Sequence, residues 1–220
     1  MNKGKQFWHA LWESGNLPFH RPLVNDDLIQ FWPSLQTADN PSILVPLCGK
    51  SLDLLWLVDQ GATVTGIELS ELAVQQLAAE NHLPLKQQTI DDCLCYSSPA
   101  LTLWVHDLFT LPQRLIEPAE GLYDRGALVA LPAALRAAYT SRCLQWLKSK
   151  GRILLKTLTY NQTLMEGPPY SVTPDELAAL YPGCTLHLLK ESHRRMDESD
   201  SLFVRGLREV IDYVWLIERN

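Results

Sequence analysis

Residues 43–51 read ILVPLCGKS, an apolar run that ends in a short turn with one glycine. A run that is apolar throughout is typical of a strand buried on both faces of a parallel sheet. A segment of helical spacing follows at 51–59, and the β-branched run 63–68 comes next. This alternation predicts successive βα units in a doubly wound α/β sheet, with 43–47 as its central strand.

The rest of the chain continues this pattern less regularly. We expect a helix at 70–81, a hairpin of strands at 92–96 and 101–105, a strand at 121–124, a helix at 133–148 that stops before Gly151, a strand at 152–158 and a terminal antiparallel pair at 184–189 and 210–217. Residues 1–41 have helical spacing and then a loop, and we expect them to form a cap across one end of the sheet. The prediction is a single domain over 1–220, with its α/β core at 42–220.

Composition limits the classes of partner. The chain has 25 acidic against 19 basic residues and a formal charge of −6, so a nucleic-acid partner is disfavoured. Five cysteines, an odd number at scattered spacings, do not form a disulfide framework and favour the cytoplasm. No apolar run reaches the roughly 18 residues of a membrane helix, and the N-terminal segment lacks a signal-peptide pattern, so no membrane partner is expected.

The turn at 46–51 is a candidate ligand site, because ligands bind at the carboxyl ends of strands in open α/β sheets. Gly49 would let the backbone approach a ligand, and the following helix would supply N–H groups. Gly49-Lys50-Ser51 matches the end of a phosphate-binding loop, but that motif requires a glycine where the chain has Leu44. The three-glycine dinucleotide motif is also absent. The turn therefore suits a ligand without a pyrophosphate.

Glu68 ends the second predicted strand, 19 residues after Gly49. A carboxylate at this place can accept hydrogen bonds from both hydroxyls of a ribose. A solvated charge at a strand end is an equal alternative for Glu68 alone, but its spacing from Gly49 favours the ligand. A ribose without a pyrophosphate indicates an adenosine with another substituent, of which S-adenosylmethionine is the common case. A nicotinamide cofactor would need its pyrophosphate held without the usual glycines.

Two later motifs bear on the chemistry. Arg125, within Tyr123-Asp124-Arg125-Gly126, would project into the same crevice and hold a carboxylate or an anionic nucleophile; a surface Asp–Arg pair is an equal alternative. Residues 167–170 read GPPY, whereas amino-directed methyltransferases begin a similar motif with Asp or Asn, so amino methylation is disfavoured. Cys93 and Cys95 lack a second close pair for zinc, and we expect no metal.

Several motifs occur in the order and spacing of a known family. They are FWHALWE at 7–13, FH at 19–20, VPLCGKSLD at 45–53, GIELSE at 66–71, YDRGALVA at 123–130 and GPPY at 167–170. From about residue 6 to the C-terminus the chain resembles the bacterial form of the thiopurine S-methyltransferase family. The resemblance implies a class I S-adenosylmethionine-dependent methyltransferase. It implies a doubly wound, mostly parallel, seven-stranded Rossmann-like sheet with an N-terminal helical cap, in a monomer.

The resemblance also implies site residues. Cofactor contacts are expected at Trp12, Leu47, Glu68, Asp107, Leu108 and Arg125, with Trp8 as a further candidate. Phe19 would line the acceptor pocket, and Arg125 would lie where cofactor and acceptor meet. Val105-His106, just before Asp107, depart from the family pattern.

The function expected from these residues is methyl transfer to the sulfur of a small aromatic or heterocyclic thiol. Bacterial members of the family are associated with selenium and tellurium oxyanions as well, and nothing in the residues separates these acceptors. Arg125 would orient the anionic acceptor, and Trp12 and Phe19 would exclude water. Asp124 is a weak candidate for a general base. Two alternatives stay open: a nicotinamide-dependent oxidoreductase on a Rossmann-like fold and a non-catalytic adenosine-ligand binding protein.

Overall fold

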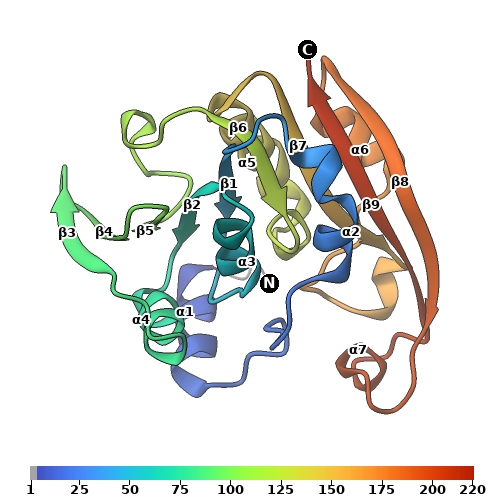
Figure 1. Cartoon of the computed structure of the whole chain (residues 1–220). Coiled ribbons are helices and arrows are strands. Elements are labelled where there is room, and N and C mark those ends of the chain that lie inside the picture. Colours follow the sequence, from blue (N-terminus) through green and yellow to red (C-terminus); the bar gives the residue numbers. More distant parts are fainter. Residues whose placement is uncertain (1–3) are drawn as a thin grey trace.

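One mixed sheet runs through the computed structural model, which describes residues 4–220 (Figure 1). Its strands are β1 Ser42–Pro46, β2 Thr63–Glu68, β3 Lys86–Ile90, β4 Cys93–Ser97, β5 Leu101–Val105, β6 Ala119–Asp124, β7 Leu147–Thr159, β8 Cys184–Arg195 and β9 Glu209–Arg219. Their order in the sheet is β3-β4-β5-β2-β1-β6-β7-β9-β8. Neighbours from β5 to β7 pair in parallel, and both flanks are antiparallel. The prediction that β1 is central is confirmed.

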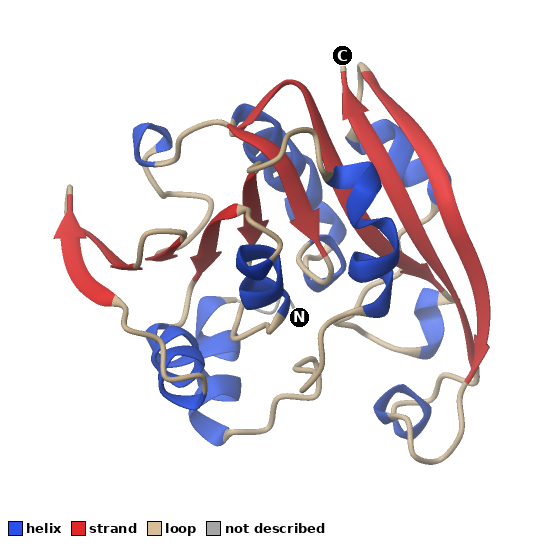
Figure 2. Ribbon diagram, viewed as in Figure 1, coloured by secondary structure: helices blue, strands red, loops and turns tan. Residues whose placement is uncertain are grey.

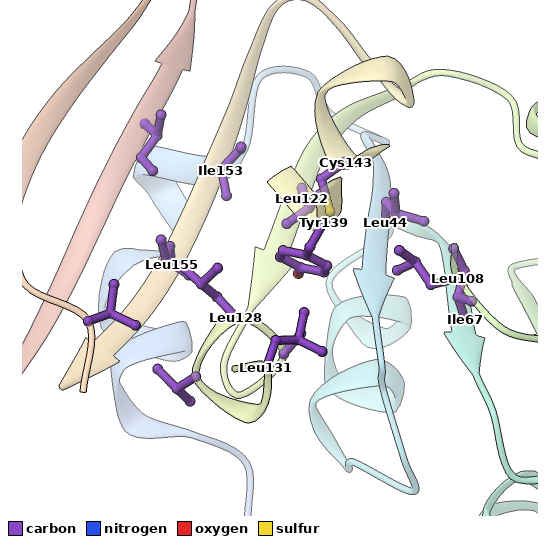
Figure 3. Close-up of a cluster of buried hydrophobic side chains, with 14 of the residues drawn as sticks. Leu44, Ile67, Leu108, Leu122, Leu128, Leu131, Tyr139, Cys143, Ile153 and Leu155 are labelled. Carbon is purple, nitrogen blue, oxygen red and sulfur yellow. The ribbon is translucent and has the colours of Figure 1, made fainter. Parts of the chain in front are cut away.

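Helices cover both faces of this sheet (Figure 2). They are α1 Lys5–Ser14, α2 Asp26–Leu35, α3 Asp53–Asp59, α4 Glu71–Glu80, α5 Ala133–Gln145, α6 Pro174–Leu180 and α7 Ser201–Val204, with 3-10 turns η1 Gln113–Leu115, η2 Leu128–Ala130 and η3 Gln162–Leu164. One hydrophobic cluster joins the sheet to α2, α3 and α4, and a second joins it to α5 and α6. In the second cluster, Leu44 and Leu122 of the central strands lie near Tyr139 of α5 (Figure 3). The doubly wound prediction is confirmed.

The expected count of seven strands is wrong, because the sheet has nine. The predicted hairpin of β4 and β5 and the terminal pair of β8 and β9 are both present. The strand that the sequence did not predict is β3, which pairs with β4 at one edge of the sheet. All five of its residues are exposed, so it has no buried face and no apolar alternation to predict it.

The boundary between α5 and β7 also differs from the prediction. The helix ends at Gln145 rather than at 148, and β7 begins at Leu147. The carbonyl of Trp146 accepts a hydrogen bond of 2.7 Å from the Ala119 N–H of β6. Because of this bond, the chain joins the sheet directly after the helix. Gly151 therefore lies within β7 instead of ending the helix.

The N-terminal segment has two parts. Helix α1 lies beside α4 at the carboxyl ends of the central strands, and residues 15–25, which we call the strap, lead from it to α2 (Figure 1). The predicted cap is confirmed for α1, whereas α2 packs against the sheet face over β7 and β9. Asn25 caps α2 by accepting the Asp27 N–H. The sequence did not predict this helix, because Pro33 in its last turn is unfavourable in a helix. None of the helices in 4–220 is long and apolar enough to cross a membrane.

Candidate active site

The turn after β1 has an unusual backbone. Leu47 has a φ of +47° and Gly49 a φ of +56°, so a non-glycine residue occupies the left-handed region here. Such strain collects at functional sites, where the surrounding structure holds it in place. The Cys48 N–H donates a hydrogen bond of 3.0 Å to the Ile67 carbonyl and fixes the turn to β2. The glycine predicted to admit a ligand is thus held at the carboxyl edge of the sheet.

Glu68 lies at the end of β2, directly beside this turn. Its Oε2 accepts the Gly49 N–H at 2.8 Å, and its Oε1 accepts the Ser70 N–H at 2.8 Å. The residue is only 6 % exposed, and this burial raises the pKa of Glu68 while the backbone N–H groups oppose the shift. Each carboxylate oxygen can accept a further hydrogen bond. The donor and acceptor chemistry therefore fits the two hydroxyls of a ribose.

Aromatic side chains from α1 and the strap cover the turn. Trp12 is buried, and a Cβ atom at Gly49 would come within 3.3 Å of the Trp12 ring. Phe19 packs edge to face on Trp12 and Trp8, with ring centroids 5.7 and 5.8 Å away, and stays 40 % exposed. Two of the predicted site residues, Trp12 and Phe19, are therefore in contact, and Trp12 joins Phe19 to the Gly49 turn.

Arg125 follows β6 and reaches the same turn. Its Nε lies 2.8 Å from Oδ2 of Asp53, and its Nη2 donates a hydrogen bond of 3.0 Å to the Ser51 hydroxyl. The Arg125 side chain is 20 % exposed and pairs with Asp53, so it does not form a surface pair with Asp124. Sequence reasoning missed Asp53, because an acidic residue in the first turn of a helix has an ordinary explanation in the helix dipole.

Asp107 and Leu108 follow β5. One oxygen of Asp107 accepts the Phe109 N–H at 3.0 Å, and the other forms an ion pair of 2.6 Å with Lys5 of α1. The side chain of Leu108 is buried in the core with Leu44 and Ile67 (Figure 3). Leu108 can therefore meet a ligand through its backbone, and Asp107 links the end of β5 to α1.

Asp124 does not face the crevice. Its Oδ1 accepts the N–H groups of Gly126 and Ala127, at 3.2 and 2.8 Å, and its Oδ2 accepts the Tyr139 hydroxyl at 2.6 Å. The residue is buried, which raises the pKa of Asp124. The hypothesis that Asp124 is a general base does not fit this geometry, because the carboxylate closes the turn after β6.

A cavity of about 450 Å³ lies between the strap and the connection from β8 to α7. It is lined by Leu17, Pro18, His20, Arg21, Arg195, Met196, Asp197, Ser199, Asp200 and Ser201. Burial and the charges of Lys50 and Arg125 lower the pKa of His20, while the charge of Glu80 opposes the shift. The sequence predicted no site residue in the C-terminal region, where the family resemblance is weakest.

Known proteins resemble this chain over its whole length. A family model described as Thiopurine S-methyltransferase (TPMT) matches residues 3–220. A thiopurine S-methyltransferase of Legionella pneumophila (strain Paris) is 50 % identical over 221 residues, covering 100 % of both chains. One of Vibrio cholerae serotype O1 (strain M66-2) is 39 % identical over 216 residues, covering 98 % of each.

Solved structures share the fold at low sequence identity. A magnesium protoporphyrin IX methyltransferase from Synechocystis with bound SAH has a TM-score of 0.66 at 13 % identity, covering 98 % of this chain and 99 % of that chain. TehB from Haemophilus influenzae has a TM-score of 0.64 at 12 % identity, covering 98 % and 67 %. Neither a nicotinamide-dependent oxidoreductase nor a non-catalytic binding protein is supported by these matches. The chain belongs to the thiopurine S-methyltransferase family and is a methyltransferase that uses S-adenosylmethionine.

Proposed function

We propose that the chain methylates the sulfur of a small aromatic or heterocyclic thiol. The observation that carries this proposal is the position of Trp12, which packs over Gly49 on one side and against Phe19 on the other. One indole thus joins the turn proposed for the cofactor to the aromatic ring proposed for the acceptor. The names of the relatives support a thiol as acceptor.

The proposed cofactor contacts come from the ends of three neighbouring strands. Glu68 would accept the ribose hydroxyls with the lone pairs that Gly49 and Ser70 leave unused. The strained turn at Leu47 would present backbone groups, and Asp107 and Leu108 would line the adenine side. When bound, S-adenosylmethionine supplies a methyl group on a positively charged sulfur, which an acceptor sulfur attacks in line. Trp12 would shield this region from water.

The proposed acceptor contacts are Phe19 and Arg125. Phe19 is exposed enough to offer its ring to a flat acceptor. Within the described chain, Nη1 of Arg125 has no acceptor, so the guanidinium can hold a thiolate or another anionic group. An aromatic thiol ionises readily, so alignment and charge stabilisation suffice and the chain needs no general base. The same charge would hold a selenium or tellurium oxyanion.

The chain is also proposed to act as a single-domain monomer in the cytoplasm. Trp12, Glu68 and Arg125 all reach the turn after β1 from the same chain, which supports the monomer. All five cysteines are free, which suits a reducing compartment.

A transfer assay with labelled S-adenosylmethionine tests the proposed acceptor. The acceptors are a thiopurine, a simple aromatic thiol, selenite and tellurite, each tested with wild-type protein and with the Arg125→Ala variant. We expect methylated product from both thiols and a large loss in the variant. Cofactor binding without transfer to either thiol would overturn the proposal. Product from the oxyanions alone would mean that the acceptor is a selenium or tellurium oxyanion and not a thiol.

A further inference from the structure

Asp53, in the first turn of α3, has a fully buried carboxylate that no proposed contact uses. The residue is 0 % exposed. Its Oδ1 accepts the Asn25 N–H at 2.8 Å, and its Oδ2 accepts the Tyr123 hydroxyl at 3.1 Å. The same Oδ2 lies 2.8 Å from Nε of Arg125. The strap, the end of β6 and the loop that follows it are all distant in sequence from Asp53, and they meet at this one side chain.

A buried carboxylate is costly unless its charge is paired and its oxygens are hydrogen-bonded. Here Arg125 supplies the opposite charge, and the Asn25 N–H and the Tyr123 hydroxyl donate one hydrogen bond to each carboxylate oxygen. Burial and the neighbouring Asp53 raise the pKa of Tyr123, so its hydroxyl stays protonated and donates. Arg125 therefore supplies the positive charge that offsets the burial of this carboxylate.

Arg125 is held along one side only. Nε pairs with Asp53, and Nη2 donates to the Ser51 hydroxyl, which also accepts the Asp53 N–H at 3.3 Å. The ion pair at Nε and the hydrogen bond from Nη2 lie along one edge of the planar guanidinium, so Nη1 lies away from these two anchors. That edge is the one with no acceptor in residues 4–220. Asp53 thereby sets the direction in which Arg125 offers its charge.

We propose that Asp53 is a positioning residue that orients Arg125 toward the methyl acceptor. The inference rests on the role given to Arg125 in the proposed function. It differs from a purely structural role, in which Asp53 would only anchor the strap through Asn25. A structural anchor would act whether or not Arg125 is present, whereas a positioning residue acts through Arg125. The two roles therefore predict different results when substitutions at Asp53 and Arg125 are combined: additive losses for an anchor and non-additive losses for a positioning residue.

A double-mutant cycle on the full chain separates them. The variants are Asp53→Asn, Arg125→Ala and the pair, measured as kcat/KM for an aromatic thiol, with the Kd for S-adenosylhomocysteine and the melting temperature alongside. Tyr123→Phe, which removes one donor to Asp53 and keeps the ring, forms a second cycle with Arg125→Ala. Glu218→Gln is the matched control, because it breaks a carboxylate–arginine pair with Arg152 at the opposite end of the sheet.

We expect Asp53→Asn to lower kcat/KM by about tenfold in the wild-type background and to add little once Arg125 is Ala. Tyr123→Phe should give a smaller loss of kcat/KM that also depends on Arg125. It tests the inference even if Asp53→Asn does not fold. The Kd for S-adenosylhomocysteine should stay at the wild-type value in Asp53→Asn and Tyr123→Phe, and Glu218→Gln should match wild type in every measurement. Additive losses, or wild-type rates in Asp53→Asn and Tyr123→Phe, overturn the inference. A wild-type protein that methylates no thiol would instead overturn the proposed function.

Discussion

Glu68 and Gly49 are hydrogen-bonded to each other, with the carboxylate accepting the glycine N–H at 2.8 Å. The bond ties the end of β2 to the turn after β1, so the two features expected to hold the cofactor already form one unit. A preorganised acceptor binds a ligand without the cost of ordering its own side chain. The strength of the site should accordingly depend on both the glycine backbone and the carboxylate.

Gly49→Ala should weaken cofactor binding. Its backbone has a φ of +56°, which costs an alanine roughly 1–2 kcal/mol, and the new Cβ would lie 3.3 Å from Trp12. Displacement of Trp12 should raise the Kd for S-adenosylhomocysteine in calorimetry. Gly126→Ala is the control, because a Cβ there meets nothing within 4 Å. Equal affinities in both variants would show that the close approach of Trp12 has no part in binding.

Asp124→Asn should lower the free energy of unfolding more than it lowers the rate of methyl transfer. The substitution removes a charged acceptor from the Tyr139 hydroxyl and from the backbone N–H groups after β6, and we expect a loss of about 1.5–3 kcal/mol in urea unfolding. Tyr139→Phe removes one of these bonds and should cost less. A variant with wild-type stability and abolished turnover would return Asp124 to the chemistry as a base.

Cofactor affinity should fall as the solution becomes acidic. Burial raises the pKa of Glu68, so its carboxylate is protonated at a higher pH than an ordinary glutamate, and the protonated group is a weaker acceptor for ribose hydroxyls. Stability responds in the opposite direction at this group, because a raised pKa in the fold favours the protonated folded state as the pH falls. Asp27 and Glu120 have a lowered pKa in the folded protein. Their ionised forms therefore stabilise the fold, and this contribution is lost as the pH falls through their lowered pKa values.

Calorimetry of S-adenosylhomocysteine binding and thermal melting, both measured from neutral to acidic pH, show whether cofactor affinity is lost before stability. The Kd should rise while the melting temperature still holds. An affinity that stays constant until the protein unfolds would mean that ionised Glu68 is not needed for binding.

The sequence predicted the parts of the site that depend on the two neighbouring strands β1 and β2 and on the turn after β1. The apolar run of β1, the glycine after it and the carboxylate at the end of β2 follow from burial and from the βα repeat, so their proximity could be foreseen. Trp12 could be placed only through the family resemblance, since an aromatic residue at helical spacing is more often part of a core.

The remaining features depend on contacts between distant segments. Strand β3 is wholly exposed and polar except for Ile90, and it pairs with the edge that β4 offers. The end of α5 is set by the bond from Ala119 to Trp146, which no local propensity contains. Asp53 gains its partners from the strap and from beyond β6, 28 and 70 residues away for Asn25 and Tyr123. Local patterns carry no signal for such pairs.

Calorimetric affinity for S-adenosylhomocysteine in Glu68→Ala tests the central claim most directly. Glu120→Ala is the matched control, because Glu120 also accepts a backbone N–H, that of Ser42 at 2.9 Å, but at the other end of the sheet. Loss of a charged acceptor worth about 1.5–3 kcal/mol should weaken binding by roughly tenfold or more in Glu68→Ala, and Glu120→Ala should bind as wild type does. Wild-type affinity in a folded Glu68→Ala variant would contradict the account.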